Sequence, residues 1–309
     1  MPSAPSGEVM RQLPAGDEMF LDHVAHFVRD AEAASRALHR AGFAPTPVST
    51  QVNSNSTGGL IPTGTGNVTA MFRRGYTEVL FKSADTPLTR EFDAALARHA
   101  GLHLAAFSVA DAAKARTRLA AAGFAVRDLV NMQRPVGTET GTDTAAFTIA
   151  RVEPGMMPEG RIQILTHNTE AAVWQSRWLS HPNSVRDLID VVIVVADVEE
   201  AASRFARFTG RAAMPTPGGA LIRLDRGGVY LLSHDRAAEK LPEVPVKALP
   251  FMIGYALGVE SLAAAEAAVE RADLDWRAFD DGIVATFPSE LGEGAWFFVE
   301  QSSDLPWRH

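Results

Sequence analysis

The chain has 309 residues, of which 46% are hydrophobic and 21% charged, the balance of a globular protein with room for two domains. A net charge of −8 argues against nucleic acid or an anionic membrane as the main partner. The absence of cysteine excludes disulfides, thiolate nucleophiles and cysteine-type zinc sites. No apolar run approaches membrane-spanning length, and residues 1–16 lack the pattern of a signal peptide, so a cytoplasmic location is expected.

A strand followed by an alanine-rich helix occurs four times along the chain, which indicates an internal repeat. The four strands lie within residues 20–28, 103–111, 190–197 and 253–261. In the first copy Asp30 has the side chain of a helix N-cap, and Gly42 ends the helix. The repeated order predicts four related modules.

The first copy extends into a β-α-β-β-β unit over residues 18–85. Residues 45–66 are rich in Ser, Thr, Asn, Gly and Pro, which predicts a long loop or a short irregular strand. The Arg74-Gly75 turn then joins strands predicted over 67–73 and 76–82.

The second unit repeats this order. Its predicted elements are a connector helix over 88–99, a strand over 102–109, a helix over 111–122, and strands over 125–132, 145–151 and 161–166. A helix over 169–179 then carries Trp174 and Trp178 one turn apart, and Pro182 ends it.

The second half follows the same design with fewer polar residues. Its predicted elements are strands over 188–195, 220–224 and 229–233, a helix over 198–208, a linker over 240–250 and a fourth unit over 251–300. The resulting domain layout is a flexible segment over 1–16, a first domain over 17–170 with modules 17–85 and 100–170, a linker helix over 171–186, and a second domain over 187–303.

Two motifs carry a resemblance to a known family. The paired units open with Asp22-His23-Val24, and a Gly-Thr-Gly-Asn segment ending at Asn67 precedes Gly-Tyr-Thr-Glu-Val-Leu at 75–80. In these features the chain resembles the vicinal oxygen chelate superfamily, and within it the two-domain glyoxalase-like proteins. The resemblance implies an α+β fold of four βαβββ modules, which form two domains with curved, mostly antiparallel sheets.

The resemblance also implies a divalent metal, Zn, Ni, Mn or Fe, held inside the first domain. The matching ligand positions are His23, Glu78, His103 and Gln163. Glu78 lies among apolar residues, where a lone carboxylate is costly unless it is paired or ligating, and it is also a candidate catalytic base.

The spacing does not decide whether His103 or Leu104 takes the third ligand position. From His23 to the phenylalanine after its helix is 20 residues, whereas from His103 to the corresponding Phe124 is 21. Without a gap Leu104 therefore takes the ligand position and His103 faces the opposite side. A bulge in the strand would restore His103.

His167 is a second candidate catalytic residue, because it follows Gln163 by four residues on the same face of a continued strand. The alternative is a helix-capping segment over 167–169. In the second domain the four ligand positions become Asp190, Tyr230, Ile253 and Phe298, which cannot hold a metal, so this half is expected to serve packing, dimerisation or a lid.

The leading functional hypothesis is an enzyme, a metal-dependent lyase or isomerase of the glyoxalase type that acts on a small substrate with vicinal oxygens. The first alternative is an Fe(II) extradiol dioxygenase, although Gln163 stands where such enzymes place a carboxylate. The second is a metal-free protein that binds and sequesters a small molecule. A homodimer is one expected assembly.

Overall fold

The computed structural model describes residues 11–54, 59–86, 89–139 and 141–308. The flexible segment predicted over 1–16 thus lies largely outside the described residues. Its described part contacts the first domain, because the Gln12 side chain donates a hydrogen bond to the carbonyl of Arg73 at 2.5 Å. None of the helices in the described ranges is long and apolar enough to cross a membrane.

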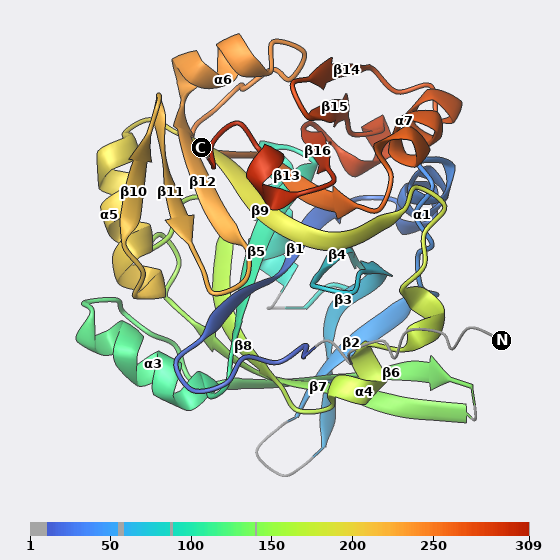
Figure 1. Cartoon of the computed structure of the whole chain (residues 1–309). Coiled ribbons are helices and arrows are strands. Elements are labelled where there is room, and N and C mark those ends of the chain that lie inside the picture. Colours follow the sequence, from blue (N-terminus) through green and yellow to red (C-terminus); the bar gives the residue numbers. More distant parts are fainter. Residues whose placement is uncertain (1–10, 55–58, 87–88, 140, 309) are drawn as a thin grey trace, which may run out of the picture.

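The four βαβββ modules predicted from the sequence are confirmed, within an α+β fold (Figure 1). The first module contains β1 (Met19–Val28), α1 (Ala31–Arg40), β2 (Ser49–Ser54), β3 (Leu60–Met71) and β4 (Tyr76–Lys82). Helix α2 (Arg90–Arg98) leads to β5 (Gly101–Val109), α3 (Ala112–Ala121), β6 (Val130–Thr138), β7 (Gly141–Arg151) and β8 (Arg161–His167).

A short connection with helix α4 (Glu170–Val173) leads to the second half. The third module contains β9 (Val185–Val195), α5 (Val198–Thr209), β10 (Ala213–Thr216), β11 (Gly219–Arg223) and β12 (Gly228–Ser233), followed by α6 (His234–Lys240). The fourth contains β13 (Phe251–Val259), α7 (Leu262–Arg271), β14 (Trp276–Phe279), β15 (Gly282–Thr286) and β16 (Ala295–Val299).

The first two modules close into an eight-stranded barrel, whereas the last two form an open sheet. In the barrel β2 pairs with β6, and this contact joins the two modules at their outer strands. Their counterparts β10 and β14 have only four residues each and form the two edges of the second sheet. The sheets change over between β8 and β9, and we propose the domain boundary in this interval.

Three elements differ from their predictions. The polar stretch 45–66 contains β2 and the start of β3, because threonines 63 and 65 face a polar part of the barrel and bond there to Gln51. The strand predicted from 125 begins only at Val130. The helix predicted over 169–179 ends at Val173, because Trp174 leaves the helical conformation and packs on Tyr76.

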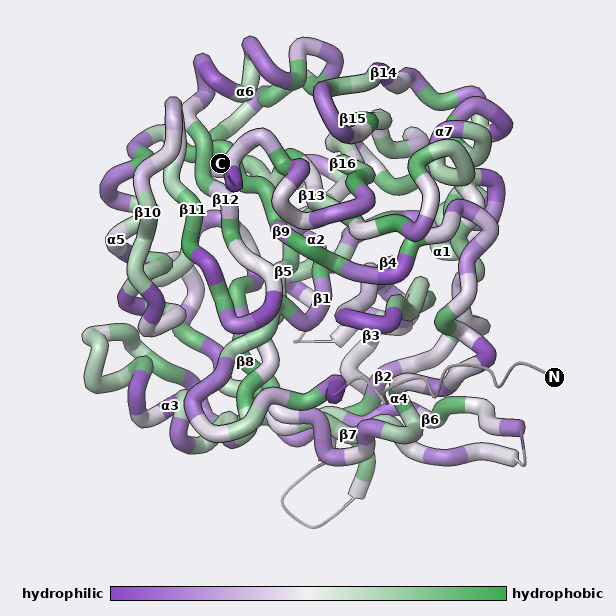
Figure 2. Tube along the Cα trace, viewed as in Figure 1, coloured by the Kyte–Doolittle hydropathy of each residue, from purple (hydrophilic) through white to green (hydrophobic). Residues whose placement is uncertain are grey.

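The two sheets pack back to back through their central strands β1, β5, β9 and β13 (Figure 1). Backbone hydrogen bonds link them, from Leu21 to the carbonyl of Arg226 and from Leu188 to that of Arg74. Hydrophobic residues follow β9, β12 and β13 through the interior, while hydrophilic residues lie on the outer helices α3 and α6 (Figure 2). This packing leaves the interior of the barrel as a separate compartment.

His26 lies at the contact between the two sheets, and from its burial we expect the protein to lose stability in acid. Its ring nitrogens bond to the carbonyl of Leu291 and the hydroxyl of Tyr255, and burial lowers the pKa of His26 to about 4. Unfolding restores the ordinary pKa near 6.5, so between these pH values the unfolded chain binds more protons and stability falls as pH falls.

We therefore expect His26→Gln to make the pH dependence of unfolding shallower, by about 2 kcal/mol between pH 7 and pH 4.5. Urea denaturation at these pH values measures the difference. The exposed His39 supplies the control, since His39→Gln should keep the slope of the parent protein. Equal slopes for both variants and the parent would contradict the assignment.

Candidate functional site

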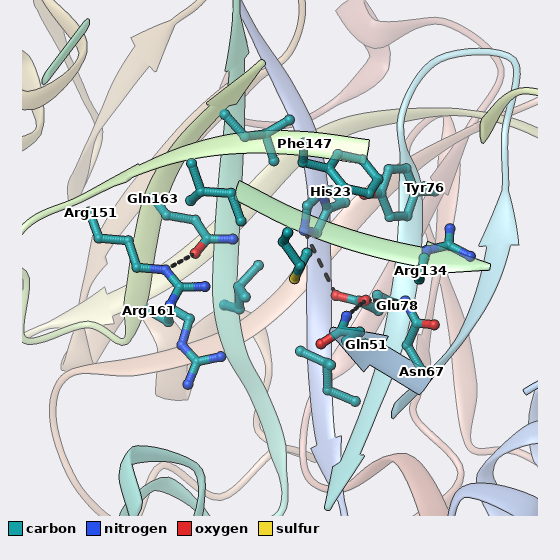
Figure 3. Close-up of a pocket in the computed structure, with 15 residues that line it drawn as sticks. His23, Gln51, Asn67, Tyr76, Glu78, Arg134, Phe147, Arg151, Arg161 and Gln163 are labelled. Carbon is teal, nitrogen blue, oxygen red and sulfur yellow. Dashed lines mark hydrogen bonds and ion pairs between the residues drawn. The ribbon is translucent and has the colours of Figure 1, made fainter. Parts of the chain in front are cut away.

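Every strand of the barrel contributes at least one side chain to a cavity in its interior (Figure 3). The cavity holds about 430 Å³ of empty space, including the part open to solvent. Alternate residues of a strand face the same side, which explains the spacing of two along β4, β6, β7 and β8. The polar lining residues are His23, Gln51, Asn67, Tyr76, Glu78, Arg134, Arg151, Arg161 and Gln163.

A β-bulge in β1 brings Asp22 and His23 together. Leu21 pairs with Phe107 while His23 pairs with the adjacent Ala106, so Asp22 is the extra residue. The Asp22 carboxylate oxygen Oδ1 lies 2.7 Å from Nδ1 of the His23 ring. The bulge thus supplies a buried carboxylate directly behind the histidine.

Asp22 bonds to three side chains. Its Oδ2 lies 2.8 Å from Nε2 of His167, and it also hydrogen-bonds with the hydroxyl of Tyr76. Burial alone would raise the pKa of Asp22, but the charges and hydrogen bonds of His167 and His23 outweigh it and hold that pKa well below its usual range. The ionised carboxylate can only accept, so it fixes the N–H of His23 on Nδ1 and leaves Nε2 toward the cavity.

Glu78 faces His23 from the neighbouring strand β4. Its Oε2 lies 3.8 Å from Nε2 of His23. Its other oxygen, Oε1, accepts hydrogen bonds from the amides of Asn67 at 2.5 Å and Gln51 at 3.3 Å. Two amide donors on one oxygen hold the carboxylate in place and orient the second oxygen toward the imidazole.

Tyr76 completes this side of the cavity. Its ring stacks on His23 with centroids 4.4 Å apart and an angle of 18° between the planes. Burial, with the charges of Asp22 and Glu78, raises the pKa of Tyr76 well above its usual value, so its hydroxyl stays protonated. Gly75, just before it, has a φ of +75° and lies under the carbonyl of Asp22, where a Cβ would come within 2.8 Å.

Of the four expected metal ligands the structure brings together His23, Glu78 and Gln163, and it places His103 elsewhere. The Oε1 atom of Gln163 accepts a hydrogen bond from Nε of Arg151 at 2.9 Å. Leu104 lines the cavity at the remaining position. The expectation that His103 joins the cluster is therefore wrong.

The physical reason is the direction of the bulge in β5. Ala25 pairs with Leu104 and His26 with Leu102, so His103 is itself the bulged residue. Its ring packs against Phe27, with centroids 5.3 Å apart, and lines a second cavity instead of the one at His23 and Glu78. Its Nε2 instead bonds to the carbonyl of His99 at 2.8 Å. Burial lowers the pKa of His103 to about 3, which keeps the ring neutral.

His167 lies behind the site and not in the cavity lining. Its ring is buried between Phe147 and Trp174 and bonds to Asp22. In this position it can orient Asp22 and share the charge of that carboxylate, but it does not face the space where a substrate would lie. The His167 ring therefore does not cap a helix, which was the alternative interpretation.

Three cavity arginines did not enter the sequence prediction: Arg134, Arg151 and Arg161. A signal for them exists, because each lies two residues from another lining residue along its strand, as Arg161 does from Gln163. This spacing can be recognised only after the barrel shows which face of each strand points inward.

The donor set does not fit the four-ligand metal site that the resemblance implies. His23 and Glu78 face each other, but a leucine replaces the third ligand and Gln163 is engaged by Arg151. Within the described ranges no group of three or more His, Asp or Glu residues could hold a metal ion. The two-histidine, one-carboxylate set of the dioxygenase alternative is not assembled here either.

In the second domain the C-terminal segment fills the corresponding position. Asp190, the counterpart of His23, accepts hydrogen bonds from Nε1 of Trp307 and from the guanidinium of Arg308. The Trp307 ring also stacks on Tyr230, with centroids 4.7 Å apart. These contacts serve packing, in keeping with one of the roles expected for this half.

Solved structures with this fold span several activities. A hypothetical protein from Staphylococcus aureus aligns with a TM-score of 0.64 at 8% identity, covering 91% of this chain and 98% of the other. The Mn(II)-bound glyoxalase from Novosphingobium aromaticivorans aligns with 0.52 at 12% identity, covering 91% and 82%. A mutant of 4-hydroxymandelate synthase from Streptomyces coelicolor aligns with 0.50 at 13% identity, covering 91% and 92%.

At these identities the likeness shows the fold alone, and no curated protein matches the chain. The sequence profile of the glyoxalase-like domain matches residues 21–209, which is more than half of the chain and includes all of the barrel except the first two residues of β1. The chain therefore belongs to the glyoxalase-like domain family, within the vicinal oxygen chelate superfamily.

Proposed function

We propose that the barrel of the first domain is the active site of a lyase or isomerase that moves a proton on a small substrate with adjacent oxygens. The observation that carries the proposal is the chain Asp22–His23–Glu78, with its contacts of 2.7 Å and 3.8 Å. A histidine oriented by a buried carboxylate, with a free nitrogen toward a cavity, is the arrangement of a general base.

The surrounding residues support this chemistry. A proton taken up at Nε2 of His23 is stabilised by Glu78 on one side and by Asp22 through Nδ1 on the other. The neutral Tyr76 holds the imidazole plane by stacking and excludes water from that face. Glu78 can accept this proton from Nε2 at its Oε2 and pass it to a neighbouring atom of the substrate, because Oε2 carries no other hydrogen bond within the described part of the chain.

A direct test is solvent exchange at the carbon next to a carbonyl. Wild-type protein in D₂O, incubated with a panel of small 2-oxo and 2-hydroxy carbonyl compounds, should incorporate deuterium at that carbon in at least one of them, as seen by proton NMR. The exchange should require His23 and Glu78. Failure of the whole panel, with folded protein, would favour the alternative of a binding protein without catalysis.

A metal-dependent form of the same activity is the second candidate. It is favoured by the contact of Asp22 with Nδ1 of His23, because metal-ligating histidines usually donate their other ring nitrogen to a carboxylate. A Zn, Ni, Mn or Fe ion at His23 and Glu78 would supply Lewis acidity toward a substrate oxygen. Only two unengaged protein ligands support it, and three arginines line the same cavity.

Metal analysis of the purified protein separates the two candidates. With the present donor set we expect well below one metal per chain after dialysis, and no change in His23→Ala, because two ligands beside three cations bind a divalent ion weakly. A stoichiometric metal in the parent protein that is lost in His23→Ala would instead establish the metal-dependent form.

A further inference from the structure

Two arginines of the barrel meet carboxylate charge only beyond ion-pair distance within the described ranges: Glu91 acts on both of them, and Glu78 also acts on Arg161. Arg151 and Arg161 form no ion pair there. Nε of Arg151 donates to the neutral amide of Gln163, and the Arg161 guanidinium lies 5.3 Å from the ring centroid of Phe27. By contrast Arg127, at the barrel surface, pairs with two glutamates.

The third cavity arginine has a different role. Arg134 is only 6% exposed, and the charge of Glu78 acts on it. Its positive charge therefore offsets the carboxylate of Glu78. No acid other than Glu78 lines this cavity in the described part of the chain, so Arg151 and Arg161 have no ion-pair partner among its lining residues.

Leaving these two cations unpaired costs free energy. Burial lowers the pKa of both guanidinium groups, which is the sign that the charged form lacks solvation. The charge of Arg161 on β8 also lowers the pKa of Arg151 on the paired strand β7. A half-buried charge without an ion-pair partner persists in a protein mainly where something binds it.

The two sides of the cavity differ in character (Figure 3). Arg151, Arg161 and Gln163 lie on one side, Glu78 with its amide partners lies on the other, and His23 lies between them. A molecule that spans the cavity would thus meet a cationic wall at one end and the proton-transfer pair at the other.

We propose that Arg151 and Arg161 bind an oxyanion of the substrate, a carboxylate or a phosphate, whose reacting carbon lies at His23 and Glu78. The planar guanidinium offers parallel N–H donors that match the two oxygens of such a group. Gln163 orients Arg151 through its Oε1 and is thereby a positioning residue. The inference deepens the proposed function, since it assigns the substrate class of the same site.

A second cavity connects this pair of arginines to the outside. Arg151 and Arg161 also line it, and it holds about 1030 Å³ of empty space including the part open to solvent. Its other charged lining residues are Arg98, Arg127, Glu91 and Glu153, so the four arginines outnumber the two glutamates. Positive charge along a route raises the local concentration of anions and speeds their association. Anion binding should accordingly weaken as the salt concentration rises.

The test is calorimetric titration with malonate, with its uncharged analogue malonamide, and with inorganic phosphate. We expect wild-type protein to bind malonate or phosphate and not malonamide, and Arg161→Met and Arg151→Met to weaken that binding by about tenfold or more, the usual effect of losing a charge-assisted hydrogen bond. The preferred anion assigns the oxyanion as carboxylate or phosphate.

Arg207 provides a matched control. Its guanidinium lies 5.3 Å from the ring centroid of Phe124, the same separation as in the Arg161–Phe27 contact, but on the surface. Arg207→Met should keep wild-type affinity. Thermal melts guard against misfolding, since without ligand Arg161→Met should be at least as stable as wild type once its unpaired charge is gone.

Equal binding of malonate and malonamide, or wild-type affinity in Arg161→Met, would overturn the inference. His23→Gln separates it from the proposed function, because this variant removes proton transfer and should still bind the anion. Anion binding through Arg161 without any exchange activity would defeat the proposed function alone, and exchange without such binding would defeat this inference alone.

Discussion

Glu78→Gln is expected to lower the rate of substrate proton exchange by more than about a hundredfold, within the range that general acid–base groups contribute. The replacement keeps the shape of the side chain and an oxygen for the amides of Asn67 and Gln51. It removes the charge 3.8 Å from His23 that stabilises the imidazolium. The loss should appear in kcat with little change in KM, because the interaction is made as the proton moves.

His23→Gln should cause a loss of similar size, and the double variant should lose little more than either single one, since the two groups act as a unit. Glu32, an exposed residue of α1, gives the control Glu32→Gln, which should retain full exchange. Wild-type kcat in Glu78→Gln would show that this carboxylate takes no part in the chemistry.

Asp190→Asn is expected to lower the free energy of unfolding by about 3 kcal/mol, the range for removing one partner of a buried ion pair. Asp190 is fully buried, and it bonds to Arg308 and to Nε1 of Trp307. The variant would leave the Arg308 charge without its carboxylate and loosen the C-terminal segment from the open sheet. Urea denaturation, followed by tryptophan fluorescence, measures the change.

A double-mutant cycle with Arg308→Met checks the cause. If the cost arises from the unpaired guanidinium, Asp190→Asn should be less destabilising in the Arg308→Met background than alone. Asp235 is an exposed residue of α6, and Asp235→Asn should change stability by less than about 0.5 kcal/mol. A similarly small effect for Asp190→Asn would mean that the C-terminal contact contributes little to the fold.

Part of the candidate site could be named before the strands were paired, through the resemblance to the vicinal oxygen chelate superfamily. His23 follows an acidic residue in an otherwise apolar strand, and Glu78 stands in an apolar setting, so both were candidates before the strands were paired. Gln163 was recoverable by the repeat, because its strand occupies the same place in the second module. Such residues can be predicted because equivalent positions recur in each copy of a repeat.

Asp22 and His167 show why the remainder could not be predicted. In a regular strand Asp22 would face away from His23, and only a bulge set by the pairing of β1 with β5 brings the two together. The contact of His167 with Asp22 joins residues 145 positions apart. Sequence patterns do not contain the register between such distant strands.

The sequence by itself determined the four-module repeat, which follows from residue order and periodicity. The α+β fold and the loss of the ligand positions in the second half followed from the resemblance to the vicinal oxygen chelate superfamily. Tertiary structure decided that the first sheet closes, that Leu104 and not His103 faces the cavity, and that Arg151 and Arg161 meet there. The physical reason is that the inside of a barrel is defined by strand pairing, and a single bulged residue reverses which side chain faces it.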